Sequence, residues 1–215
     1  MSHLRSEMDP TWKHPFTSVI AGPTGSGKTY FVERFITHID KMMTPTPDEI
    51  IWCYSEYQPA YEQLSRQGVV FVEGLPKTDE WDTNKRRLVI IDDLMNETDE
   101  SVTRLFTKGS HHRNMSVMYI VQNLFAKTKH QRTISLNAHY LVLFKNPRDV
   151  SQIMHLGKQM FPGQAQYFRE AFKSATHAPH SYLLVDMRQE TGDSLRLRSH
   201  IFPNEQHTVF VPRNA

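Results

Sequence analysis

A glycine-rich segment constrains the fold of this chain more than any other feature. Two glycines five residues apart are followed directly by Lys28 and Thr29, which is the P-loop pattern. The apolar run 16–21 before the segment is typical of a buried strand, and the run 28–41 after it repeats apolar residues at helical spacing. A strand, a glycine turn and a helix in this order bring backbone N–H groups and a helix N-terminus to one point, where they favour a bound phosphate.

The P-loop pattern also predicts the cofactors and the residues that hold them. We expect ATP, with its phosphates wrapped by the loop, because glycines let the backbone approach the phosphates at positive φ. Lys28 is placed to reach the β and γ phosphates, and the hydroxyl of Thr29 is placed to ligate Mg²⁺. The alternative is a glycine-rich turn without a ligand. The expected nucleotide contacts are Gly22, Pro23, Thr24, Gly25, Ser26, Gly27, Lys28, Thr29 and Tyr30.

Two carboxylates follow the most strand-like run of the chain. Residues 88–91 form this run, and Asp92 and Asp93 come directly after it. Ligands bind at the carboxyl ends of strands in open α/β sheets, so we expect Asp92 to hold Mg²⁺ through its water shell. We assign to Asp93 the catalytic role of orienting or deprotonating the attacking water. The alternative is that Asp93 only caps the following helix.

A glutamine ends another predicted strand. Gln122 follows residues 117–121, and its amide is placed to bridge the attacking water and the γ phosphate at the same edge of the sheet. A polar residue at a strand end is common, so this signal alone is weak. Together with the P-loop and the paired carboxylates, it indicates hydrolysis of ATP more than phosphoryl transfer to a small molecule.

Apolar runs alternate with helical stretches through most of the chain, which predicts a three-layer α/β fold with a mostly parallel central sheet. At about 100–200 residues per domain, we expect one domain. It has an N-terminal arm at 1–15, a P-loop core at 16–147, and helices with a β-hairpin at 148–215. Further strands are predicted at 50–54, 69–72 and 139–144, further helices at 59–67, 99–108, 149–160 and 164–173, and hairpin strands at 181–187 and 195–202.

Composition excludes several classes of protein. The longest apolar runs are far shorter than the roughly 18 residues that a membrane span requires, so we expect no membrane span. The polar N-terminal segment does not resemble a signal peptide. The single cysteine, Cys53, can form no internal disulfide, which favours a reducing intracellular location.

Basic charge is concentrated in the second half of the chain. The first 107 residues carry 11 basic and 17 acidic side chains, whereas the remaining 108 carry 14 and 6. This asymmetry favours a basic surface that meets a polyanion, and a solvated basic face without a partner is the alternative.

The P-loop, the acidic strand and the glutamine strand, with the residues around them, resemble the genome-packaging ATPases of the FtsK/HerA superfamily. The poxvirus-type enzymes of large eukaryotic DNA viruses and of Polinton (Maverick) transposons are the nearest in pattern. The resemblance covers about residues 16–160. It is carried by Ile20 to Thr29, Val89 to Leu94, His112-Arg113-Asn114, Tyr119 to Leu124, Ser135-Leu136-Asn137 and Leu143 to Asp149.

The resemblance implies a RecA-like core, a homo-oligomeric ring of six subunits, and ATP-driven translocation of double-stranded DNA into a preformed capsid through its portal vertex. It also implies a location in the host nucleus or a cytoplasmic virus factory, with association with the virion. Asp93 departs from the pattern, because many members of the wider superfamily carry Glu there. Asp is one methylene shorter, which puts its reach to the water in doubt.

Ring motors of this kind complete each site with an arginine from the neighbouring subunit. Arg113 is the first candidate, because it precedes the glutamine strand and matches the resemblance, and Arg104 and Arg132 compete with it. A surface arginine without this role is the alternative for each.

Basic residues after the glutamine strand are candidates for contacts with DNA phosphates. The segment 124–132 is predicted to be a basic loop, and Lys127, Lys129 and Arg132 are its candidate contacts. A solvated loop is the alternative. Arg196 and Arg198 alternate with leucines in the predicted hairpin and form a second candidate surface.

Two other functions compete with the packaging motor. One is another DNA-directed P-loop ATPase, such as a helicase, a conjugation-type pump, or a replication or transposition accessory factor. The other is a small-molecule kinase, which would require a lid and a nucleoside pocket.

Overall fold

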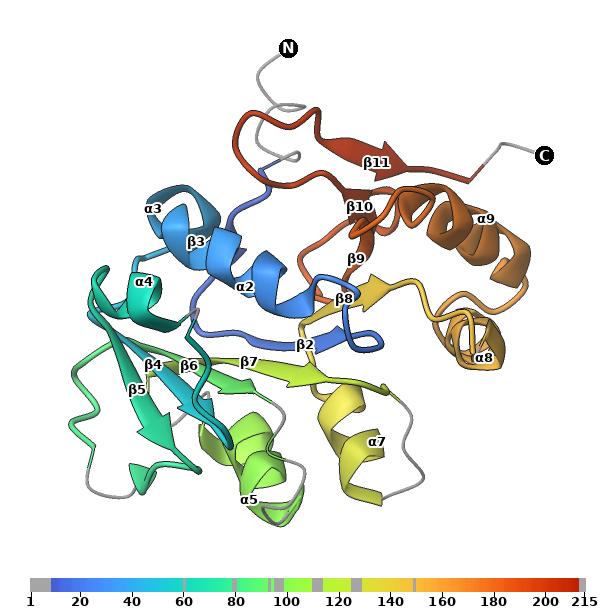
Figure 1. The fold of residues 1–215 in the computed structure, drawn as a ribbon. Coiled ribbons are helices and arrows are strands. Elements are labelled where there is room, and N and C mark those ends of the chain that lie inside the picture. The colour runs from blue at the N-terminus through green and yellow to red at the C-terminus, as the bar shows by residue number, and fades with distance from the viewer. Residues whose placement is uncertain are drawn as a thin grey trace.

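A nine-stranded mixed sheet forms the centre of the molecule (Figure 1). The computed structural model describes residues 9–212 except 60, 79–80, 93, 95–98, 110–113, 125–128 and 149. The strand order is β11-β10-β9-β8-β2-β7-β6-β4-β5. The strands are β2 (Thr17–Ala21), β4 (Glu49–Tyr54), β5 (Val69–Glu73), β6 (Arg87–Asp92), β7 (Met115–Val121), β8 (Tyr140–Phe144), β9 (Tyr182–Asp186), β10 (Leu197–Ser199) and β11 (Thr208–Phe210).

The sheet has a parallel part and an antiparallel part. Strands β8, β2, β7, β6, β4 and β5 pair in parallel, whereas β9 runs antiparallel to β8, β10 to β9, and β11 to β10. This arrangement confirms the predicted α/β fold with a mostly parallel sheet. The predicted pairing of a C-terminal hairpin is confirmed by β9 and β10, but β11 was not predicted.

Helices cover both faces of the sheet. One face is covered by α2 (Lys28–Thr37), α3 (Ile39–Met42) and α4 (Tyr61–Ser65). The other is covered by α5 (Asp99–Arg104), α7 (Lys129–Leu136), α8 (Val150–Met160) and α9 (Ala165–Ala175). Two short helical segments are also described, the π-helical η2 (Leu105–Gly109) and the 3₁₀-helical η3 (Asp193–Leu195).

Each parallel strand contributes to both cores. In β6, Leu88 and Ile90 belong to the core under α2, whereas Val89 and Ile91 belong to the core under α5 and α7. A parallel strand that is buried on both faces must be apolar at every position, which explains why the run 88–91 is uninterrupted.

The N-terminal segment is tied into the core under α2. Strand β1 (Trp12–Lys13) pairs in parallel with β3 (Met43–Thr44) in a separate two-stranded sheet. Trp12 is buried and stacks on Tyr140 of β8, with ring centroids 4.2 Å apart. Part of the predicted arm therefore packs against the sheet.

Two predicted elements differ in the structure. The helix predicted at 28–41 is divided at His38, whose φ of −113° and ψ of 29° end α2. The loop predicted at 124–132 is wrong in its second half, because residues 129–136 form α7. Among the described helices, none has the length and apolarity that crossing a bilayer demands.

Candidate active site

The glycine-rich loop joins β2 to α2 as predicted. Strand β2 ends at Ala21 and α2 begins at Lys28. Gly22 N donates to the carbonyl of Val121 in β7 at 3.2 Å, which fixes the start of the loop to the neighbouring strand. Gly25 and Gly27 have φ values of 77° and 104°, and glycine is the residue that adopts these values without strain. The two glycines therefore determine the backbone geometry of the loop.

The start of the loop leaves no room for a side chain at Gly22. A Cβ at Gly22 would lie 2.6 Å from Cβ of Phe144 and 2.7 Å from Oγ of Ser26. The hydroxyl of Ser26 is buried, and it has no hydrogen-bond partner in the described part of the chain. Because a buried hydroxyl without a partner is costly, a phosphate oxygen is a fitting acceptor for it. The residues present thus fit the triphosphate that the sequence predicts.

Lys28 lies back against the loop. Its Nζ donates to the carbonyls of Gly22 at 2.7 Å and Pro23 at 3.0 Å. These bonds hold the ammonium beside the glycine turn, where a positive charge attracts phosphate. Beyond it, a hollow of about 570 Å³ is lined by Gly25, Gly27, Lys28, Thr29, Tyr30 and His180.

Asp92 is the last residue of β6 and lies at the same edge of the sheet. It pairs in register with Ile120 of β7, which pairs with Ile20 of β2. The side chain is buried, and its Oδ2 accepts a hydrogen bond of 3.2 Å from the hydroxyl of Tyr61. Asp93, predicted to act on the attacking water, lies outside the described residues, so its role stays a prediction.

Gln122 directly follows β7, and β7 lies between β2 and β6. The carbonyl of Val121, one residue earlier, accepts the bond from Gly22 N. Gln122 is therefore adjacent to the start of the phosphate loop, and its side chain is exposed. The strand order brings together three of the predicted site elements: the loop, Asp92 and Gln122.

Sequence reasoning missed an acidic residue on α2. Burial raises the pKa of the Glu33 carboxyl, and the negative charge of Asp92 raises it further. The negative charge of Asp92 therefore disfavours the ionised form of Glu33. The spacing could have indicated this, since Glu33 lies four residues after Thr29 on one face of the same helix.

His180 reaches the phosphate loop from the distant segment between α9 and β9. A Cβ at Gly27 would lie 3.1 Å from Cβ and 3.2 Å from Nδ1 of His180. His180 itself has a φ of 58°, in the left-handed region. No local pattern in the sequence indicated this contact, because α8 and α9 separate His180 from the predicted core.

The predicted basic residues are only partly described. Arg113 and Lys127 lie outside the described residues, so both stay predictions. Lys129 is the first residue of α7, and Arg132 is exposed on the same helix. Arg104, the other arginine considered for the neighbouring site, is exposed at the end of α5.

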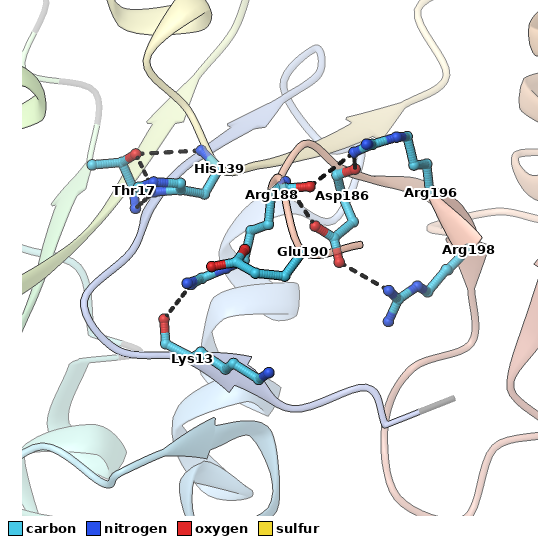
Figure 2. A network of polar contacts seen from close by, with 8 residues as sticks. All are labelled: Lys13, Thr17, His139, Asp186, Arg188, Glu190, Arg196 and Arg198. Atoms are coloured by element: carbon cyan, nitrogen blue, oxygen red, sulfur yellow. Dashed lines mark hydrogen bonds and ion pairs between the residues drawn. The ribbon is translucent and has the colours of Figure 1, made fainter. Parts of the chain in front are cut away.

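The second candidate DNA surface, Arg196 and Arg198, is wrong (Figure 2). Nη2 of Arg198 lies 2.9 Å from Oδ2 of Asp186, and the two side chains are only 7% and 5% exposed. Arg196 pairs with Asp193 at 2.8 Å and donates to two backbone carbonyls. Alternation along one strand predicted a basic face, but Asp186 of the neighbouring strand β9 pairs with Arg198, and Asp193 of η3 pairs with Arg196.

Among the described residues, no three His, Cys, Asp or Glu side chains are grouped so as to hold a metal ion on their own. The residues that would hold a magnesium ion at this edge are Thr29 and Asp92, together with the nucleotide phosphates, as in P-loop sites. No protein-family model matches the chain, and no curated protein matches it significantly.

Proposed function

We propose that this protein is an ATPase that couples hydrolysis to the translocation of double-stranded DNA, as a genome-packaging motor. The observation that carries the proposal is the order of the strands at the carboxyl edge. Strands β2, β7 and β6 bring the phosphate loop, Gln122 and Asp92 into one row. The order β8-β2-β7-β6-β4 also supports the finer assignment to a RecA-like core.

The intervening strand has a chemical consequence. Neighbouring strands lie about 4.8 Å apart, so the P-loop strand and the acidic strand are separated by roughly 10 Å. That gap accommodates a γ phosphate and a water in front of Gln122. This spacing suits a residue that orients the attacking water, because Gln122 follows the strand that lies between the phosphate loop and Asp92.

In this proposal each residue has one task. Lys28 and the loop N–H groups bind the phosphates and stabilise charge that develops on them. Gln122 orients the attacking water, and Asp93 accepts its proton. Thr29 and Asp92 would hold Mg²⁺, which when bound neutralises charge on the β and γ phosphates.

The coupling to DNA is assigned to α7. This helix begins seven residues after Gln122 and carries Lys129 and the exposed Arg132, and basic side chains bind DNA phosphates without regard to sequence. Lys127 is a third candidate. A hexameric ring, an arginine supplied in trans by Arg113, and a capsid portal as partner follow from the resemblance and belong to the same proposal.

The test compares ATP hydrolysis by the wild type, Lys28→Ala and Asp93→Asn. Each is assayed alone, with long duplex DNA and with single-stranded DNA at low salt. Lys173→Ala removes an exposed lysine of α9 and serves as the matched control. We expect duplex DNA to stimulate the wild type and the control, and we expect roughly a 100-fold or larger loss in both site variants, as for loss of charge-stabilising groups in other enzymes.

The alternatives predict other outcomes of the same test. Stimulation by single strands together with unwinding of a forked duplex would identify a helicase. Displacement of a triplex strand from intact duplex supports the motor. Hydrolysis that is indifferent to DNA would refute translocation, and phosphoryl transfer to a nucleoside would identify a kinase.

A further inference from the structure

The carboxylate of Asp92 is held by a tyrosine from another element. The hydroxyl of Tyr61, in α4, donates to Oδ2 of Asp92 at 3.2 Å. Tyr61 is 1% exposed and Asp92 is 8% exposed. A hydroxyl is costly to bury in a core unless it forms a hydrogen bond. The position of this hydroxyl, next to the carboxylate at the strand end, is therefore a specific feature of the site.

A cluster of aromatic rings fixes Tyr61 in place. Its ring stacks on Phe71 of β5, with centroids 4.7 Å apart and planes at 20°. Trp52 of β4 lies 5.5 Å away, and Tyr57 meets the ring at 5.5 Å and 89°. Packed aromatic rings have little rotational freedom. The rings of Trp52 in β4 and Phe71 in β5 thus hold Tyr61 so that its hydroxyl points at Asp92.

The chemistry of the donor suits a carboxylate that must stay charged. The phenol of tyrosine is a neutral O–H donor throughout the physiological range. A lysine or arginine here would cancel the negative charge of Asp92, and a hydrated cation requires that charge. A neutral donor orients the carboxylate and leaves its charge in place.

We propose that Tyr61 is a positioning residue that orients Asp92 toward the magnesium ion of the bound nucleotide. This inference rests on the proposed function, since it presumes that Mg²⁺ and a nucleotide bind at this edge. Partners that hold a metal ligand in place typically contribute 10–100-fold to metal affinity. Tyr61 would contribute in this way without touching the nucleotide.

The experiment measures how Mg²⁺ increases the affinity for a fluorescent ATP analogue. In Tyr61→Phe, which keeps the ring, we expect the half-saturating Mg²⁺ concentration to rise about tenfold. We expect the affinity in EDTA and the melting temperature to stay close to those of the wild type. Tyr57→Phe is the matched control, because Tyr57 belongs to the same ring cluster and is 55% exposed.

A second measurement separates positioning from a general loss of structure. In an Asp92→Asn background, Tyr61→Phe is expected to change the Mg²⁺ dependence no further, because the two residues act as one unit. The inference would be overturned, and the proposed function left standing, if Tyr61→Phe had the Mg²⁺ requirement of the wild type. The same holds if its nucleotide affinity fell as much in EDTA as in Mg²⁺. A wild type whose nucleotide affinity does not depend on Mg²⁺ would instead overturn the proposed function.

Discussion

Charged side chains gather at both edges of the parallel sheet, but they are arranged in opposite ways. At the amino edge, where β9 ends, charges of opposite sign meet: Arg198 with Asp186 at 2.9 Å and Arg188 with Glu190 at 3.3 Å. Arg188 also donates to the carbonyl of Lys13, which ties in the N-terminal segment (Figure 2). At the carboxyl edge, by contrast, charges of like sign act on each other: burial raises the pKa of the Glu33 carboxyl, and the negative charge of Asp92 raises it further.

This contrast shows how to separate a structural cluster of charges from a chemical one. Each member of a pair of opposite charges offsets much of the cost of burying the other, so removing one member alone destabilises the fold. Like charges held close together cost stability, and proteins retain such arrangements at sites where a ligand compensates for them. The buried Ser26 hydroxyl without a partner belongs to the carboxyl edge as well. The amino edge is therefore a structural clamp, and the carboxyl edge is the candidate site.

The largest effect is expected from breaking the clamp. Arg198→Met leaves Asp186 buried without its partner, which should cost about 3–5 kcal/mol of unfolding free energy. The measurement is the urea midpoint and slope, with Arg169→Met, an exposed arginine of α9, as control. Adding Asp186→Leu should restore much of the loss. If Arg198→Met alone kept normal stability but bound nucleotide more weakly, the role of this ion pair would not be purely structural.

A smaller effect is expected at the start of the phosphate loop. In Gly22→Ala, the new methyl group meets Phe144 and Ser26 within 2.7 Å, and overpacking of this kind costs about 1–3 kcal/mol. Nucleotide affinity, measured by calorimetry, should fall at least roughly tenfold, which corresponds to about 1.4 kcal/mol. Gly192→Ala is the control, since nothing lies within 4 Å of its added methyl group. If Gly22→Ala bound the nucleotide as tightly as the wild type, the phosphate loop would not be the nucleotide site.

Acid should weaken the amino edge through His14. Its Nδ1 lies 2.7 Å from the Ser116 hydroxyl and its Nε2 2.8 Å from Oδ1 of Asn114, and burial lowers its pKa below 6.5. Because the folded state favours neutral imidazole, this contribution is present above pH 6.5 and is lost as pH falls through the lowered pKa. Between pH 7 and pH 5, the melting temperature of His14→Gln should therefore fall less than that of the wild type. If the melting temperatures of His14→Gln and the wild type fell equally over this pH range, His14 would be excluded as the cause.

The smallest effect has the opposite sign. The raised pKa of Glu33 means that folding disfavours its ionised form, so this destabilisation is absent below pH 4.5 and complete once pH exceeds the raised value. Glu33→Gln should therefore raise the melting temperature slightly near pH 7.5 and leave it unchanged near pH 4. Glu62→Gln, at an exposed position of α4, is the control. A destabilised Glu33→Gln would mean that the site does not repel charge.

Sequence predicted the central strands well because their burial on both faces leaves a local trace. A run such as 88–91 must be apolar throughout in order to be covered by helices on both sides. Helix α7 has no such trace: its one buried side chain among those described is Ile134, so its polar sequence reads as a loop. Strands β1, β3 and β11 have two or three residues each, and only tertiary pairing defines them.

The candidate site divides in the same way. The P-loop is readable because one continuous segment supplies the turn, the lysine and the helix start. Tyr61 and His180 reach the site from other elements, and their positions depend on packing that no local pattern encodes. The hairpin arginines were misread for the same reason, since Asp186 lies across the strand pair from Arg198.

Strand β7 has parallel neighbours on both sides, and all seven of its residues are buried. Amide protons in such a strand exchange with solvent only when the whole domain opens. In deuterium-exchange measurements, β7 would therefore serve as an internal reference that reports global unfolding alone. Nucleotide-dependent changes should be confined to the segments that leave its carboxyl end, and their exchange rates, referred to β7, would resolve local opening from loss of the fold.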